Sequence, residues 1–249
     1  MKRIIPQPIE IKEKNGVCKT PGTVTTIRAD GLRDEAYFIT SSEDGIVIGA
    51  SSPAGEFYAQ KTLRQLRLLY PNEFPCFEIK DAPFFGYRGF MLDSARHFIS
   101  VDEIKKIVEI ASRFKFNRFH WHLSDDQGFR IQLDSFPELV SKGSIRPGDT
   151  YRNLPKTNTP YGGFYTKDEI RGIVAFWKER HIAVIPEIDM PGHVSAILYT
   201  YPQYHCGQKP VDIKTKEGIF EDIFCAGSEE TYRFIYRLLD EITELFPCE

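Results

Sequence analysis

The segment FHWHLSDDQGFR, residues 119–130, contains the residue types that most often carry out proton transfer. Two histidines and two adjacent aspartates lie within a short stretch of it. Imidazole and carboxylate groups act as general acids and bases, and they also bind divalent metals. The segment is therefore open to three interpretations: a metal site, a strand with a polar end, or one wall of a carbohydrate pocket.

A metal site is the weakest of these interpretations. His120 and His122 form an HxH pattern, and His193, Asp125 or Asp189 would have to complete the ligand set. Catalytic zinc usually has three protein ligands, and HxH alone is a common pattern. The step from His122 to Asp125 also leaves the predicted strand. We therefore expect no metal, and keep a metal-dependent barrel hydrolase as a rival hypothesis.

Alternation along the chain indicates that residues 117–124 form a strand. Phe119, Trp121 and Leu123 would share one face, with His120 and His122 on the other. In a (β/α)8 barrel the apolar face turns toward the surrounding helices, and the active site lies at the carboxyl ends of the strands. His122 is near that end, and the two aspartates follow it.

Two further strands change from apolar to ionisable residues at the same end. The strand HIAVIPEID, residues 181–189, carries Glu187 and Asp189 at its end, and His193 follows in the next turn. The strand YRGFMLDSA, residues 87–95, is followed by Arg96. Because the carboxyl ends of parallel strands meet at one edge, the pattern predicts the mouth of an active site.

Some nearby residues also have plain structural explanations. His120 lies deeper in its strand and is predicted to be a hydrogen-bonded core histidine, and Arg130 a structural ion-pair partner. Asp126 is explained equally well as the cap of a turn and as a residue beside the catalytic groups. Trp177, on a helix, is predicted to pack in the core.

The elements that must position these residues alternate in type. Helices are expected over 100–114, 166–180 and 228–246, with capping boxes at Ser100 and Glu103 and at Thr166 and Glu169, and with Ser228 as a possible cap. A long loop should run from about residue 127 to 165. Strands alternating with helices predict an α/β fold, here about three βα units of a (β/α)8 barrel in residues 83–249.

Residues 1–82 form a different, smaller unit. Residues 36–50 predict a hairpin turning at Asp44-Gly45, and the next segment has helical spacing of its apolar residues. This pattern predicts a small α+β domain that ends near Pro83.

Composition excludes several classes of protein. The chain has 249 residues, of which 41% are hydrophobic and 27% charged, as is typical of globular proteins. The net charge of −3 argues against nucleic acid or an anionic membrane as a partner. The amino terminus has no apolar signal core, so a cytoplasmic location is expected unless a secretion leader has been removed. Five widely spaced cysteines favour reduced, mostly buried thiols over a disulfide framework.

The segments YRGFMLDSARHF, FKFNRFHWHLSDDQGFRIQLDSFPEL and HIAVIPEIDMPGHVSA resemble, in order and spacing, the family 20 glycoside hydrolases, the β-N-acetylhexosaminidases. IIPQPIEIKEKNG and GEFYAQKTLRQL resemble the small accessory domain of that family. Phe129 stands where the family usually has tryptophan. The resemblance implies a substrate-assisted retaining hydrolase of terminal GlcNAc or GalNAc residues on oligosaccharides or glycoconjugates, which is an exception to the two-carboxylate glycosidases. It also implies that no metal and no organic cofactor is needed.

The resemblance also implies roles for individual residues. Arg96 matches the arginine that binds hydroxyls of the terminal sugar. Asp125 and His193 match an aspartate and a histidine beside the catalytic acid. The other substrate-binding residues that we expect are His122, Glu187 and Asp189.

The family's catalytic Asp-Glu pair follows two glycines at the end of the fourth barrel strand, and residues 1–249 contain no such segment. We therefore expect the pair after Glu249. We also expect this chain to be inactive by itself, and to associate with a chain that supplies the rest of the barrel. The alternative is a non-catalytic, sugar-binding scaffold.

Overall fold

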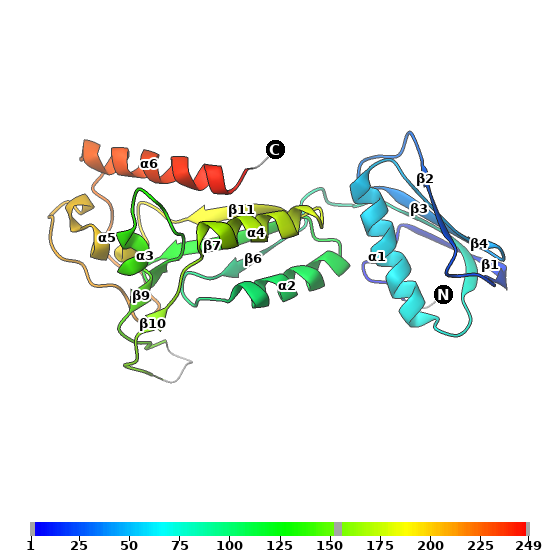
Figure 1. The fold of residues 1–249 in the computed structure, drawn as a ribbon, viewed down its shortest axis with the longest axis horizontal. Helices are drawn as coiled ribbons and strands as arrows, with labels where there is room; N and C mark the ends of the chain where they lie inside the picture. The colour runs from blue at the N-terminus through cyan, green and yellow to red at the C-terminus, as the bar shows by residue number, and fades with distance from the viewer. Residues whose placement is uncertain (1–2, 152–155, 248–249) are drawn as a thin grey trace. The chain divides into compact units, whose positions relative to one another are not determined.

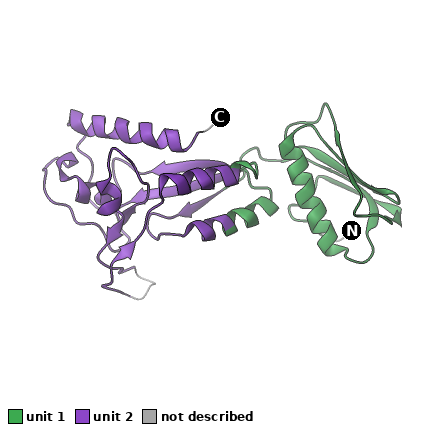
Figure 2. Cartoon of the chain, in the orientation of Figure 1, with its two compact units in different colours: residues 1–89, 106–117, 178–182 green, residues 90–105, 118–177, 183–249 purple. Residues whose placement is uncertain are grey.

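The computed structural model describes residues 3–151 and 156–247. The chain divides into two compact units, coloured separately in Figure 2. Unit 1 comprises residues 1–89, 106–117 and 178–182, and unit 2 comprises residues 90–105, 118–177 and 183–249. No helix in the described residues is long and apolar enough to cross a membrane.

Unit 1 contains a five-stranded sheet in the order β1-β5-β3-β4-β2. Its strands are β1 (Glu10–Val17), β2 (Val24–Arg28), β3 (Tyr37–Ser42), β4 (Gly45–Ala50) and β5 (Pro75–Asp81). The predicted hairpin is confirmed, because β3 and β4 pair antiparallel around a turn that ends at Gly45 with φ of 147°. The predicted helix is α1 (Pro53–Leu69), whose residues Tyr58, Leu63 and Leu66 are buried with Ile39 and Ile48 of the sheet.

The sheet of unit 2 places the predicted site. It contains β6 (Gly89–Asp93), β7 (Arg118–Asp125) and β11 (Ala183–Ile188) in the order β11-β7-β6, and the short β8 (Gly128–Phe129) pairs with β7. β11 and β7 are parallel. The helices that alternate with these strands are α2 (Val101–Arg113), α4 (Lys167–Lys178) and α6 (Glu229–Leu245) (Figure 1).

The apolar face of β7 forms the core of unit 2, as its alternation predicted. Phe119, Trp121 and Leu123 are fully buried. Trp177 of α4 stacks on Phe119 with ring centroids 3.8 Å apart, so its predicted core role is confirmed. The rings of Trp121 and Tyr165 also pack together, with centroids 4.7 Å apart. This packing fixes the strand so that its other face carries the histidines.

All three predicted helix starts are confirmed, and two of them have the predicted capping box. The backbone N–H of Ser100 donates to Glu103 and that of Thr166 to Glu169, and each hydroxyl accepts from the backbone in return. Ser228 occupies the N-cap position of α6, but its side chain makes no capping hydrogen bond. Ser228 is therefore the cap by position, without a capping hydrogen bond from its hydroxyl.

The segment predicted to be one long loop contains short elements. In addition to β8 they are α3 (Glu138–Ser141), β9 (Ile145–Arg146) and β10 (Tyr161–Gly162), the last two paired antiparallel. A second irregular segment follows β11 and contains α5 (Ser195–Thr200) and the 3-10 helix η1 (Pro202–Tyr204). Elements this short have no periodic pattern that a sequence could reveal.

Candidate active site

The carboxyl ends of β6, β7 and β11 bring four carboxylates into one cluster with an arginine and three histidines. Asp93 ends β6, Asp125 ends β7, Glu187 lies near the end of β11 and Asp189 just beyond it. The three strands are neighbours in the sheet, so residues far apart in sequence meet there. The predicted convergence of ionisable residues at one edge is therefore present in the structure.

Arg96 is held by two carboxylates. Its Nη2 lies 2.6 Å from Asp125 Oδ2, and its Nη1 lies 3.0 Å from Asp93 Oδ2. Asp93 Oδ1 also accepts the backbone N–H of Arg96, which fixes the turn after β6. The arginine side chain remains 31% exposed although both of its terminal nitrogens face carboxylates. Burial lowers the pKa of Arg96, but Asp125 and Asp93 outweigh it and raise that pKa, so the side chain is a fixed cation.

His122 lies between two carboxylates. Its Nε2 is 2.8 Å from Asp125 Oδ2 and its Nδ1 is 3.0 Å from Glu187 Oε2. Burial lowers the pKa of His122, but the hydrogen bond to Asp125 and the charges of Asp93 and Glu187 raise it overall. Arg96 Nη1 approaches Nε2 at 3.0 Å. When the His122 ring is protonated, both nitrogens are donors, so this close approach is not a hydrogen bond. The two cations lie close together because both bind Asp125.

Glu187 and Asp189 have opposite tendencies to hold a proton. Burial raises the pKa of Glu187, but the charge and hydrogen bond of His122 outweigh it and lower that pKa. Burial and the neighbouring Glu187 raise the pKa of Asp189 despite the opposing charge of His122. Folding thus moves the pKa values of the two carboxyl groups in opposite directions.

The prediction for His120 is wrong. Its side chain is 37% exposed, and its Nε2 lies 2.5 Å from Glu187 Oε2. It is therefore a half-buried member of the charged cluster and not a core residue. The position of His120 in mid-strand suggested burial, but the face of the sheet that carries it is covered less completely than the face that carries Trp121.

His193 reaches the cluster from the turn after β11. The residue has a positive φ of 54°, and its Nδ1 lies 2.9 Å from Asp126 Oδ2 and 3.3 Å from Asp125 Oδ1. Burial lowers the pKa of His193, but the hydrogen bond to Asp126 and the charge of Asp125 raise it overall. Asp126 is fully buried, and its Oδ1 accepts hydrogen bonds from the backbone and hydroxyl of Ser195. Asp126 thus anchors the turn that carries His193.

Arg130 supports the site, but its partners among the described residues are backbone carbonyls and not acids, so its predicted role is wrong. It is fully buried and donates to the carbonyls of Ser94, Ala95, Ser144 and Gly163. Burial lowers the pKa of Arg130 to about 10, and the nearby Arg146 adds to that effect. The guanidinium joins the turn after β6 to the segments around β9 and β10.

Sequence reasoning placed Asp93 at the ionisable end of its strand without giving it a role in the site, and it did not find a second group around Asp149. Asp149 Oδ2 lies 2.9 Å from His97 Nε2 and 2.9 Å from Arg146 Nη2. Asp93 had a usable signal, since it is the last residue of its strand, as Asp125 is of β7. Asp149 had none, because it lies in a segment without periodicity.

Two triads at the strand ends have the residue types that bind divalent metals. They are His122, Glu187 and Asp189, and Asp125, Asp189 and His193, with ligand atoms within 4.8 Å of one another. Both triads fit such an ion chemically. The same histidine nitrogens already face carboxylate oxygens, however, so a metal would have to replace those ion pairs.

The fold and the polar mouth at the strand ends define an α/β protein built like part of a (β/α)8 enzyme. The catalytic-domain model of glycosyl hydrolase family 20 matches residues 85–249, and the model of domain 2 of that family matches residues 9–82. The chain therefore belongs to glycosyl hydrolase family 20.

The chain is 44% identical over 226 residues to a β-hexosaminidase of Porphyromonas gingivalis, covering 87% of this chain and 28% of that protein. It is 36% identical to a β-hexosaminidase of Akkermansia muciniphila, covering 98% and 49%. The chain thus spans about half or less of the length of these two relatives.

A β-N-acetylhexosaminidase crystal structure superposes with a TM-score of 0.91 at 35% identity, covering 98% of this chain and 52% of that one. A Streptomyces plicatus β-hexosaminidase variant in complex with GlcNAc matches with a TM-score of 0.85 at 30% identity, covering 98% and 57%. The expected fold, a partial barrel preceded by a small α+β domain, is confirmed by these neighbours.

Proposed function

We propose that residues 1–249 provide the small domain and the first part of the catalytic barrel of a β-N-acetylhexosaminidase. Its substrates would be terminal, non-reducing GlcNAc or GalNAc residues of oligosaccharides or glycoconjugates. The observation that carries the proposal is the partly exposed side chain of Arg96, whose guanidinium is held by Asp93 and Asp125 at the mouth of the strands. A planar fork of donors suits two neighbouring sugar hydroxyls.

In substrate-assisted cleavage, one part of the protein would bind the sugar and another part would supply the catalytic acid. The acetamido oxygen of the substrate attacks the anomeric carbon while the glycosidic bond breaks, and a glutamic acid protonates the leaving oxygen. Water then opens the oxazolinium ring with the same glutamate as base, which retains the configuration. The residues described above bind and orient the sugar, with Asp125 and His193 beside the acid, and need no metal for that task.

The acid itself would come from another segment. Residues 1–249 contain no Asp-Glu pair after two glycines. In the described residues, the outer strands β6 and β11 each pair with β7 alone in their sheet, which leaves two edges for further barrel strands. Unpaired edges favour association with another segment or chain. We expect negligible turnover by residues 1–249 alone.

The test is hydrolysis of a chromogenic N-acetylglucosaminide by residues 1–249, alone and with a segment that supplies the later strands. Turnover should appear only in the combination. There, Arg96→Ala should lower kcat/KM roughly a hundredfold or more, because sugar hydroxyls lose charged donors. Arg28→Ala is the matched control, since Arg28 is 78% exposed in unit 1. Robust turnover by residues 1–249 alone would refute the divided site.

A non-catalytic, sugar-binding scaffold is the second candidate, favoured by the same open strand edges. It predicts that residues 1–249 bind GlcNAc in a calorimetric titration, and that Arg96→Ala abolishes this binding. Under this hypothesis the chain forms a defined oligomer in size-exclusion chromatography, and the added segment does not produce turnover. Turnover by the combination would exclude it.

A further inference from the structure

Two cysteines of unit 2 lie side by side, although 18 residues separate them in the sequence. His205 and Phe224, the residues before them, form an antiparallel bridge. The backbone N–H of Cys225 donates to the carbonyl of Tyr204 at 2.8 Å. Across such a bridge, residues Cys206 and Cys225 are diagonal neighbours on one side of the pair. Their thiols are close enough to share a hydrogen bond.

Exposure distinguishes this pair from the other described cysteines. Cys206 is exposed and Cys225 half-buried, whereas Cys18 and Cys76 in unit 1 are both buried. The expectation of mostly buried thiols therefore holds for only one of the two pairs, and Cys248 lies outside the described residues. Thiol–disulfide exchange requires that an oxidant reach the attacking sulfur. Only the pair in unit 2 meets that condition among the described residues.

We propose that Cys206 and Cys225 are a disulfide-forming pair that fixes the loop between them. A low-molecular-weight disulfide, such as oxidised glutathione, would be the oxidant. The Cys206 thiolate attacks it, forming a mixed disulfide and releasing one glutathione thiolate. The Cys225 thiolate then displaces the second glutathione. The two protons of the cysteines end on the two glutathione molecules, and the pair has lost two electrons.

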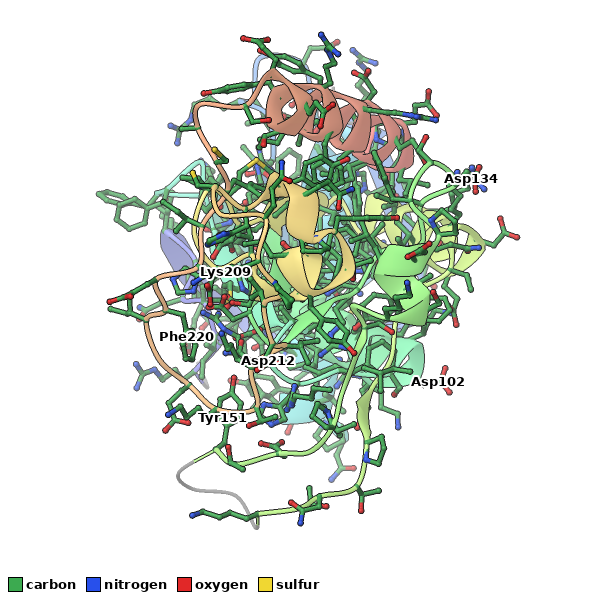
Figure 3. The ribbon with its side chains drawn as sticks, turned by 90° about the vertical axis from the view of Figure 1, so that its left-hand side faces the viewer. Asp102, Asp134, Tyr151, Lys209, Asp212 and Phe220 are labelled. Atoms are coloured by element: carbon green, nitrogen blue, oxygen red, sulfur yellow. The ribbon has the colours of Figure 1, made fainter. Side chains whose placement is uncertain are left out.

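The closed loop would lie against the candidate active site. Within it, Lys214 donates its backbone N–H to the carbonyl of Asp126 at 3.0 Å, and Gln127 Nε2 donates to the carbonyl of Lys216 at 2.9 Å. At its end, Phe224 donates to the carbonyl of Pro191. The loop, with Lys209, Asp212 and Phe220 labelled in Figure 3, thus contacts the turns that carry Asp126 and His193. A disulfide at its base would favour this closed arrangement.

The first experiment maps the disulfide directly. Residues 1–249 are incubated at mildly alkaline pH with oxidised glutathione, because exchange needs the thiolate and the hydrogen bond with Cys225 raises the pKa of Cys206. Alkylation and peptide mass spectrometry should find the two loop-end peptides joined within one molecule, with Cys18 and Cys76 alkylated. Cys206→Ser should leave Cys225 alkylated or glutathionylated.

The second experiment tests whether the bond fixes the loop. Trypsin cleavage after Lys214 and Lys216 should slow by up to a few hundredfold on oxidation, roughly the limit set by the closure entropy of a loop of about 20 residues. Cleavage of Cys206→Ser should not respond to the oxidant. The proposal is overturned if both thiols of the native chain stay alkylated, if each carries glutathione, or if they join only between molecules. Equal cleavage of the oxidised and reduced chains would overturn the fixing of the loop.

Discussion

At the scale of single residues, Asp125 organises the candidate active site. Only 1% of its side chain is exposed, and it lies within 3.3 Å of nitrogen atoms of Arg96, His122 and His193. A buried carboxylate is stable only when its charge is paired and hydrogen-bonded. Three basic side chains meet that need, and each is held in a fixed position in return.

The pKa of His122 makes the stability of the chain depend on pH in a definite direction. A histidine whose pKa is raised by folding stabilises the protein fully below its unfolded pKa, and this stabilisation is lost as pH rises through the folded pKa. We expect the free energy of unfolding to fall as the pH rises above 6.5, the ordinary pKa of histidine, and through the raised pKa of His122. Urea denaturation at several pH values measures it. His122→Gln should make the free energy of unfolding decrease less steeply with pH. Part of the decrease should remain, because the pKa of His193 is also raised.

His181→Gln is the matched control for that measurement. Burial lowers the pKa of His181, so its contribution to stability grows with pH up to its ordinary value and then stays constant. The variant should leave the decline above about pH 7 unchanged. A slope for His122→Gln equal to that of the native chain in this window would contradict the assigned ion pairs.

At the scale of secondary structure elements, Arg130 joins segments that have little regular structure of their own. Removing the guanidinium leaves the carbonyls of Ser94, Ala95, Ser144 and Gly163 without those donors. Gly128 has no room for a side chain, since a Cβ there would lie 2.3 Å from Arg130 Cζ. The arginine and the glycine therefore constrain each other's position.

Arg130→Met should lower the free energy of unfolding by about 3–5 kcal/mol, because buried carbonyls lose their partners. Arg130→Lys should be milder, because an ammonium still donates to some of these carbonyls, but it should remain destabilising, because it cannot reach all four. Tryptophan fluorescence during urea denaturation reports on unit 2, because Trp121 and Trp177, the chain's two tryptophans, both lie there. Arg28→Ala, at an exposed ion pair, should change the value by less than about 0.5 kcal/mol. If Arg130→Met changed the free energy of unfolding as little as Arg28→Ala does, the bridging role of Arg130 would be refuted.

The helix caps provide a paired test. Thr166→Ala removes a reciprocal capping box at α4 and should cost about 1 kcal/mol in the same denaturation measurement. Ser228→Ala removes a hydroxyl that makes no capping hydrogen bond at α6, and should be nearly neutral. Equal losses for the two variants would show that the caps are wrongly assigned.

At the scale of the whole molecule, the fold explains why binding and acid catalysis would come from different segments. The sheet of unit 2 supplies three strand ends, and each contributes carboxylates to one side of a site. A closed barrel collects its catalytic residues from several strands around the mouth. We therefore expect association with the later strands to complete the site and to cover the edges of β6 and β11.

Metal content separates this mechanism from a metal-dependent hydrolase. The histidine nitrogens of both candidate triads already face carboxylates, so we expect the purified chain to contain less than about one tenth of an equivalent of metal. Elemental analysis after purification without chelators measures it, and EDTA should leave Tm unchanged. One equivalent of zinc retained through gel filtration would instead favour the metal-dependent rival.

The sequence alone determined the local architecture of this protein. Alternation placed Trp121 and His122 on opposite faces of β7, capping boxes located the starts of α2 and α4, and the Asp44-Gly45 turn located the hairpin. These features arise between residues a few positions apart, where backbone geometry fixes the direction of side chains. The matching motifs also implied the family, which the two family models confirmed.

Only the tertiary structure decided which groups meet and how fully each is buried. His193 reaches Asp126 across 67 residues, Arg130 binds carbonyls instead of an acid, and His120 is half exposed. Cys206 and Cys225 become neighbours through one bridge between irregular segments. Such contacts depend on how loops without periodicity return to the sheet, and neighbouring residues along the chain do not encode that path. Local patterns therefore predicted the strand ends, while folding chose the partners of each side chain there.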